Sequence, residues 1–167
     1  MPRKKLRSLI SKPGYTIVPG AYDALTARLV QLADFEGGYL TGGGYSRASG
    51  YPDIGLLTMT EMVQWISRAV DAVDIPVIAD MDAGYGNALN VVRSVREYEK
   101  TGVAAFHLED QVSPKKCGHY EGKQVVSRAE MVGKIKAAVD TRRDADMVII
   151  ARSDARAIEG LQAAIDR

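Results

Sequence analysis

The stretch PVIADMD, residues 76–82, decides the fold of this chain because it runs from apolar to acidic within one short segment. A short apolar run flanked by Pro and Asp predicts a strand buried on both faces, as in a parallel sheet covered by helices. Asp80 and Asp82 fall at its carboxyl end, where parallel α/β folds place their ligand sites. The segment therefore predicts a buried parallel strand that leads into a polar site.

Four other segments have the same character, and helical patterns separate them along the chain. The further strand candidates are Thr16–Pro19, Gly38–Thr41, Ala104–Asp110 and Met147–Asp154. Between the strands, apolar residues recur with a period near 3.6 and form four helix faces. These faces are Leu25, Leu29 and Leu32; Met62, Ile66, Ala69, Val70 and Val73; Val91, Val95 and Tyr98; and Met131, Ile135, Ala138 and Val139. Alternating strands and helices without a linker predict one α/β domain with a parallel sheet.

Capping signals mark the expected helix boundaries. Thr58–Glu61 and Ser127–Glu130 both fit the capping-box pattern, in which the two side chains satisfy free backbone donors at a helix start. Asp23 is a candidate N-cap for the first of the four helices. Gly102 stands where a left-handed residue would end the third.

Composition limits the classes of function. The chain has 167 residues, 22 Lys and Arg against 21 Asp and Glu, and 46% hydrophobic residues, which is ordinary for a globular domain. The balanced charge argues against nucleic acid and anionic membranes as partners. One cysteine, Cys117, excludes an internal disulfide framework. No segment has the apolar core of a secretory signal or a membrane span, so we expect a cytoplasmic protein.

Polar residues gather at the carboxyl ends of four predicted strands, which indicates one shared site. Strand alternation predicts that Asp80 and Asp82 share a face, and likewise the pairs His107 and Glu109, and Tyr39 and Thr41. Two neighbouring carboxylates repel each other unless a proton or a cation lies between them. Oxygen ligands without cysteine favour Mg²⁺ or Mn²⁺ over zinc. The alternative is that the two aspartates are turn and helix-cap residues.

The loop QVSPKKCGHYEGK, residues 111–123, is the second functional signal. Its composition is typical of a mobile segment that closes over a ligand. Cys117 lies beside Lys115, Lys116 and His119, which predicts a lowered thiol pKa suited to proton transfer; the alternative is an inert buried cysteine.

Three other features keep two interpretations each. Gly42 and Gly43 could cradle a small carboxylate or form a plain turn. Arg152 could bind a substrate carboxylate through its guanidinium or serve as a structural ion-pair partner. His107 could belong to the site or to the core. Trp65 is expected to pack on its helix.

The stretches ADMDAGYGN, HLEDQ, KKCGH and ARSDA, in this order and spacing, resemble the isocitrate lyase/phosphoenolpyruvate mutase superfamily. PGAYDALTARL, YLTGGG and YPDIG fit as well, so the resemblance covers the whole chain. Within the superfamily the chain is most similar to the methylisocitrate lyase and 2,3-dimethylmalate lyase branch. KKCGH is the specific part, because it is the signature loop of the lyases.

The resemblance implies a (β/α)₈ TIM-type barrel with Mg²⁺ at the carboxyl ends of the strands. Two carboxylates would hold the metal and two others would support it through water, while Cys117 would act as general acid. The implied metal residues are Asp80 and Asp82, with Asp53 and Glu109 through water. The implied substrate-binding residues are Tyr39, Thr41, Gly42, Gly43, Gly118 and Arg152, and the implied catalytic residues are Cys117, His119, Arg152 and Glu109. Many relatives have Ser at the Thr41 position.

The implied activity is a Mg²⁺-dependent retro-aldol cleavage of a 2-hydroxy dicarboxylate or tricarboxylate, of the 2-methylisocitrate or 2-alkylmalate type. Its products would be pyruvate, or a similar 2-oxo acid, and a diacid such as succinate. Alternatives are an oxaloacetate or 2-oxo acid decarboxylase, a phosphonate-type mutase, and a non-catalytic fragment or pseudoenzyme.

The number of predicted β/α units indicates how much of a barrel the sequence contains. Residues 1–167 supply only the first five β/α units of a barrel that usually has eight. The chain stops inside a helical pattern set by Leu161, Ala164 and Ile165. We therefore expect a C-terminally truncated barrel domain that lacks turnover by itself, and a homotetramer for a full-length protein.

Overall fold

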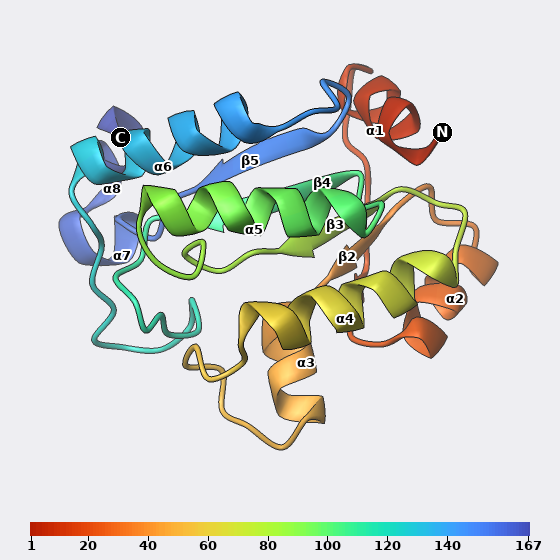
Figure 1. Cartoon of the computed structure of the whole chain (residues 1–167), viewed down its shortest axis with the longest axis horizontal. Helices are drawn as coiled ribbons and strands as arrows, with labels where there is room; N and C mark the ends of the chain where they lie inside the picture. Colours follow the sequence, from red (N-terminus) through yellow and green to blue (C-terminus); the bar gives the residue numbers. More distant parts are fainter.

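The computed structural model describes residues 1–167 and shows one sheet of five parallel strands in the order β1-β2-β3-β4-β5 (Figure 1). The strands are β1 (Gly20–Ala21), β2 (Gly38–Leu40), β3 (Val77–Asp80), β4 (Ala105–Glu109) and β5 (Val148–Arg152). Every neighbouring pair is parallel, which confirms the predicted α/β class. The sheet is open, because β1 and β5 each pair with one neighbour only.

Helices connect the strands and cover the sheet. They are α1 (Pro2–Ile10), α2 (Ala24–Leu32), α3 (Gly42–Ala48), α4 (Met59–Asp71), α5 (Ala88–Lys100), α6 (Arg128–Thr141), α7 (Arg156–Glu159) and α8 (Leu161–Asp166). Along the sheet, α2 contacts α4, α4 contacts α5 and α5 contacts α6 (Figure 1). None of these helices is both long enough and apolar enough to cross a membrane.

The predicted helix faces of α4 and α5 form the core. Ile66 and Ala69 of α4 and Val91, Val95 and Tyr98 of α5 are fully buried, together with strand β4, which lies between β3 and β5. The predicted caps are present as well. Thr58 and Glu61 form the predicted reciprocal capping box, and Asp23 accepts from Thr26 N. Ser127 accepts from Glu130 N, but the Glu130 side chain does not bond back to Ser127 N, so only half of the second predicted box forms. Gly102 follows α5 with φ 84°, as expected for a left-handed helix end.

The predicted face of α2 is wrong. Leu25, Leu29 and Leu32 are exposed by 66%, 54% and 76%, whereas Ala27 and Val30 are buried. The three leucines do share a stripe, but α2 packs through the smaller side chains of another face. A periodic pattern identifies a stripe without fixing which stripe meets the sheet. Val139 of α6 is likewise exposed, so that face ends at Ala138.

The beginning of the chain also differs from the sequence prediction. The first strand is Gly20–Ala21 rather than Thr16–Pro19, although Pro19 O still accepts from Tyr39 N at 2.9 Å. Proline has no N–H for the ladder, which limits pairing before Gly20. The helix α1 was not predicted; its Leu6 and Leu9 are buried, and Arg3 Nη1 pairs with Asp144 at 2.7 Å.

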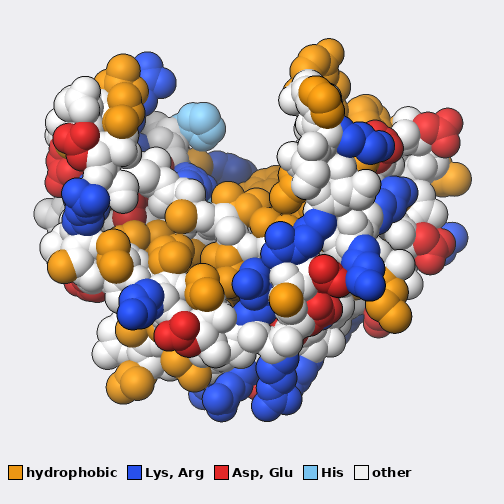
Figure 2. Space-filling view, turned by 90° about the horizontal axis from the view of Figure 1, so that it is seen from above, with side chains coloured by type: hydrophobic (Ala, Val, Ile, Leu, Met, Phe, Trp, Pro, Cys, Tyr) orange, Lys and Arg blue, Asp and Glu red, His pale blue; other side chains and the backbone are white.

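Hydrophobic side chains remain on the surface around the open sheet. Figure 2 shows a hollow between two raised parts of the molecule, with hydrophobic side chains on its floor. Ile150 on the edge strand β5 is 36% exposed, and Ile17, before β1, is also exposed. Leu161 and Ile165 of α8 are exposed too, so the helical pattern at the end of the chain forms a helix without burying these residues.

Candidate active site

The carboxyl ends of the strands and the loop 111–123 enclose a cavity of about 200 Å³. The predicted site residues that line it are Tyr39, Thr41, Gly43, Asp53, Asp80, Glu109, Cys117, Gly118, His119 and Arg152. Arg47, Lys115 and Lys116 complete the lining, whereas Gly42 and Asp82 lie just outside it. A larger cavity of about 630 Å³ lies beside α1 and α5, but none of the predicted site residues lines it. The smaller cavity is therefore the candidate active site.

Strand register brings Tyr39, Asp80 and His107 together at one end of the cavity. Asp80 on β3 is opposite His107 on β4, and the Tyr39 ring on β2 stacks against the His107 ring. The Tyr39 hydroxyl lies 2.6 Å from His107 Nε2, and His107 Nε2 lies 3.5 Å from Asp80 Oδ1. Burial lowers the pKa of His107 and so favours the neutral imidazole, although Asp80 opposes this shift. His107 of β4 therefore lies beside the candidate site, in contact with Tyr39 of β2 and Asp80 of β3.

The glycines after β2 form the first turn of α3 rather than an open turn. Thr41 is the N-cap and accepts from Gly44 N at 3.2 Å, while Gly42 N donates to Asp80 Oδ2 at 3.2 Å. A Cβ on Gly42 would lie 2.8 Å from Asp80 Oδ2, and one on Gly43 would lie 2.6 Å from Asp53 Oδ2. The glycines thus allow the helix backbone to approach two buried carboxylates closely.

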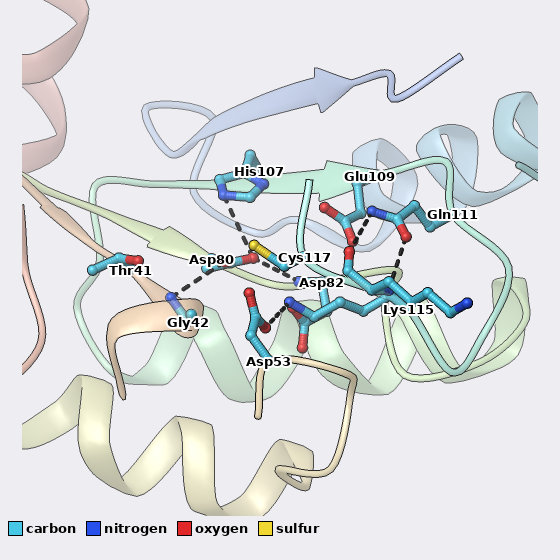
Figure 3. A network of polar contacts seen from close by, with 12 residues as sticks. Thr41, Gly42, Asp53, Asp80, Asp82, His107, Glu109, Gln111, Lys115 and Cys117 are labelled. Carbon is cyan, nitrogen blue, oxygen red and sulfur yellow. Dashed lines mark hydrogen bonds and ion pairs between the residues drawn. The ribbon is translucent and has the colours of Figure 1, made fainter. Parts of the chain in front are cut away.

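Asp82 does not share the environment of Asp80, contrary to the alternation argument. Strand β3 ends at Asp80, and Asp82 has φ 46°, so the two-residue period of a strand does not reach it. Its Oδ1 lies 2.8 Å from Lys115 Nζ, as an ion pair without hydrogen-bond geometry, and Lys115 Nζ donates to Asp53 Oδ1 at 2.5 Å (Figure 3). Burial raises the pKa of Asp82, Asp80 raises it further, and Lys115 opposes both. The cation between these carboxylates is Lys115, which was predicted instead to lower the pKa of the Cys117 thiol.

Glu109 and Arg152 face each other across the paired strands β4 and β5. Arg152 Nη1 lies 3.0 Å from Glu109 Oε2, and its Nη2 lies 3.2 Å from Asp154 Oδ2. Glu109 Oε1 is buried and has no hydrogen-bond partner. Burial raises the pKa of Glu109 to about 8, although the Arg152 charge opposes the shift. Arg152 therefore forms a structural ion pair and also lines the cavity, so both of its interpretations stand.

The loop 111–123 places Cys117 against the cavity. Cys117 is 7% exposed, and its N donates to Asp53 O at 2.9 Å. The Lys116 ammonium donates to Gly122 O at 3.0 Å, so neither neighbouring lysine is directed at the thiol. The charge beside Cys117 comes instead from Arg47 of α3, whose Nη2 lies 3.7 Å from Sγ. Sequence reasoning missed Arg47, because only the fold brings it next to a residue 70 positions away.

Two further features hold the loop in place. Gln111, which sequence reasoning also missed, receives a hydrogen bond from Lys116 N at 2.9 Å and donates one to Lys116 O at 2.9 Å. Gly118 allows Arg152 to approach, because a Cβ there would lie 2.8 Å from Arg152 Nη2. The loop is thus fixed to the ends of β4 and β5 by polar contacts.

The donor set fits a hydrated hard cation rather than zinc. No three His, Cys, Asp or Glu side chains converge closely enough to enclose a metal ion. Mg²⁺ keeps several water ligands and needs only one or two carboxylates, whereas structural zinc needs a closed set of four protein ligands. Asp80 and Glu109 line the cavity, and the unpartnered Glu109 Oε1 is the free oxygen that such an ion or its water would contact.

Comparisons with known proteins identify relatives over nearly the whole chain. Residues 6–167 match the family model described as phosphoenolpyruvate phosphomutase. The chain is 55% identical over 164 residues to 2,3-dimethylmalate lyase of Eubacterium barkeri, covering 98% of this chain and 57% of that protein. It is 46% identical to 2-methylisocitrate lyase of Aeropyrum pernix, covering 97% and 52% of the two chains.

A solved structure supports the fold. The structure of phosphonopyruvate hydrolase with oxalate and Mg²⁺ matches with a TM-score of 0.91 and 32% identity, over 99% of this chain and 57% of that one. The chain thus spans about half the length of the relatives it matches.

Proposed function

Since this chain belongs to the isocitrate lyase/phosphoenolpyruvate mutase superfamily, we propose that its cavity serves carbon–carbon cleavage of a 2-hydroxy dicarboxylate or tricarboxylate. The observation that carries the proposal is the buried thiol of Cys117, which lines one small cavity together with Asp80, Glu109 and Arg152. The similarity to 2,3-dimethylmalate lyase and 2-methylisocitrate lyase favours substrates of the alkylmalate or methylisocitrate type. The products would be a 2-oxo acid and the acid formed from the leaving fragment.

The cleavage needs one group that accepts a proton and one that donates a proton. The hydroxyl proton of the substrate passes to the deprotonated form of Glu109, whose Oε1 has no partner in the structure and whose raised pKa makes the carboxylate a stronger base. The hydroxyl carbon becomes a carbonyl, and the electron pair of the broken bond stays on the leaving carbon. That carbon receives the proton of Cys117 Sγ, which leaves a thiolate. Each proton and electron pair is thereby accounted for.

The remaining residues bind and orient the substrate. Arg152 would bind the carboxylate next to the hydroxyl, with Thr41, Gly43 and Gly118 shaping the wall around it. Mg²⁺ or Mn²⁺, held by Asp80 and through water by Glu109, Asp53 and Asp82, would supply positive charge that stabilises the deprotonated hydroxyl. Tyr39, Gly42 and His119 complete the proposed set: Tyr39 and Gly42 contact Asp80, and His119 lines the cavity.

We further propose that the five strands form part of a (β/α)₈ barrel. The open sheet and its solvent-exposed hydrophobic side chains support this, as does the share of each relative that the chain covers. A homotetramer is the proposed assembly of the full-length protein.

A substrate panel tests the reaction. The full-length protein with Mg²⁺ is mixed with 2,3-dimethylmalate, 2-methylisocitrate, isocitrate, oxaloacetate and phosphonopyruvate, and release of each 2-oxo acid is measured. We expect turnover of the alkylmalate or methylisocitrate substrate. Turnover of oxaloacetate or phosphonopyruvate alone would replace the proposal by decarboxylation or phosphonate chemistry.

Cys117→Ala tests the proton donor in the same assay. Loss of a positioned general acid should lower kcat by about 10²–10⁴-fold. Glu121→Gln, which changes an exposed residue of the same loop, is the matched control and should keep full activity. Unchanged turnover in Cys117→Ala would remove the thiol from the mechanism.

A further inference from the structure

Arg47 is a cation of the cavity wall that has no acidic partner. Its Nη1 donates to Gly43 O at 3.0 Å and its Nη2 lies 3.7 Å from Cys117 Sγ. Neither contact carries a full negative charge while Cys117 is a thiol, and Arg47 takes part in none of the ion pairs of the structure. A guanidinium on the cavity wall, held in place yet uncompensated, is suited to bind an anionic group of a ligand.

The other lining cations are already engaged. Lys115 pairs with the carboxylates of Asp53 and Asp82, and Lys116 donates to a loop carbonyl. Arg152 pairs with Glu109 and Asp154, although its planar fork can still take one substrate carboxylate. A second carboxylate of the substrate would therefore find its free positive charge at Arg47.

From this geometry we infer that Arg47 binds the carboxylate carried by the leaving fragment of the substrate and thereby selects dicarboxylates over monocarboxylates. The inference rests on the proposed function. It adds a specificity-determining residue on α3, which lines the same cavity as Arg152 of β5.

The position of Arg47 also explains which carboxylate it takes. Because Arg47 contacts Cys117 Sγ, a carboxylate bound to Arg47 brings its own α-carbon close to the thiol. That α-carbon is the one that carries the electron pair after cleavage and receives the proton of Cys117. The thiolate that remains faces the guanidinium, which stabilises it. One residue thus aligns the leaving fragment and balances the charge produced by its protonation.

Binding of a non-cleavable pair of ligands tests the inference. 2,3-Dimethylsuccinate lacks the hydroxyl group that cleavage needs, and its monoamide has the same shape with one carboxylate fewer. Calorimetric titration of the full-length protein with Mg²⁺ should show that the diacid binds at least about tenfold more tightly than the monoamide, the effect of one charge-assisted contact. In Arg47→Gln the two ligands should bind within about twofold of each other, and Arg47→Lys should keep an intermediate preference.

Arg28→Gln is the matched control, because Arg28 is exposed on α2 and does not line the cavity. It should keep the preference of the unmodified protein. A preference that survives in Arg47→Gln, or an unmodified protein without any preference, would overturn the inference.

The outcomes separate the two proposals. A diacid preference that depends on Arg47, without cleavage of any substrate in the panel, would support the inference and reject the lyase. Cleavage with a selectivity that Arg47→Gln leaves unchanged would reject the inference alone.

Discussion

Replacing Lys115 by Met should be one of the most destabilising single changes at the site. Lys115 Nζ pairs with Asp53 and Asp82, and the three side chains are only 7%, 6% and 11% exposed. Removing one partner of a buried ion pair leaves an uncompensated charge, which costs about 3–5 kcal/mol. Here two carboxylates lose their shared cation, so the upper part of that range is expected. This is a large fraction of the ~5–15 kcal/mol that stabilises a typical domain.

The pH dependence of that loss has a definite sign. Burial and then the charge of Asp80 hold the pKa of Asp82 above its ordinary value, so between the two pKa values the folded state binds more protons than the unfolded state. The free energy of unfolding therefore falls as pH rises through this window. Lys115 opposes the shift, so Lys115→Met raises the pKa of Asp82 further. The stability difference from the unmodified chain should be largest at neutral pH and shrink as the pH is lowered and Asp82 takes up a proton.

Urea unfolding followed by circular dichroism, in metal-free buffer at pH 7.5 and at pH 5, measures both effects. Lys100→Met is the control, because Lys100 and Glu97 also pair at 2.8 Å but Lys100 is 69% exposed, and it should cost less than about 1 kcal/mol. Asp53→Asn combined with Lys115→Met removes one of the two carboxylates left without a cation, and it should recover part of the lost free energy of unfolding. A cost for Lys115→Met no larger than that of Lys100→Met, or one independent of pH, would refute the reasoning.

Two other changes test close packing and a buried hydrogen bond by urea unfolding. Gly43→Ala places a Cβ 2.6 Å from Asp53 Oδ2 and should destabilise the chain by about 1–3 kcal/mol, whereas Gly133→Ala in open space on α6 should stabilise it by up to about 1 kcal/mol. Equal effects would contradict the role assigned to Gly43. Tyr98→Phe removes the donor to Asp80 O at 2.9 Å and should cost about 1–3 kcal/mol; unchanged stability would show that this carbonyl needs no partner.

The sequence predicts the sheet because the strands carry their own signal. Apolar runs that end in polar residues are local patterns, and four of the five predicted strands contain the observed strand with a few extra residues at its ends, whereas the first, Thr16–Pro19, ends just before β1. Capping residues act over three or four positions, so Asp23, Thr58 and Ser127 could be assigned without a structure. The face of α2 could not, because the choice between Val30 and Leu29 depends on which side meets the sheet.

The candidate site likewise has a part that local sequence patterns predict and a part that only the fold determines. Residues at strand ends could be predicted to converge, and Tyr39, Asp80, Glu109 and Arg152 do line one cavity. Partners brought together by the loop could not be predicted, since Lys115 reaches a carboxylate 62 positions earlier in the chain. Sequence proximity suggested that Lys115 acts on Cys117, but two buried aspartates attract the ammonium more strongly than a neutral thiol does.

The ion pairs inside the site leave one carboxylate and one cation of the cavity available to bind ligands. Lys115 compensates Asp53 and Asp82, and Arg152 compensates Glu109 and Asp154. Asp80 is the buried carboxylate that remains, because its neighbour His107 is held neutral by burial and its other contacts are uncharged donors. Arg47 is the matching cation, in contact with a thiol. A divalent cation at Asp80 and a substrate carboxylate at Arg47 would therefore each meet a side chain of opposite charge, and these are the two components that the proposed cleavage requires.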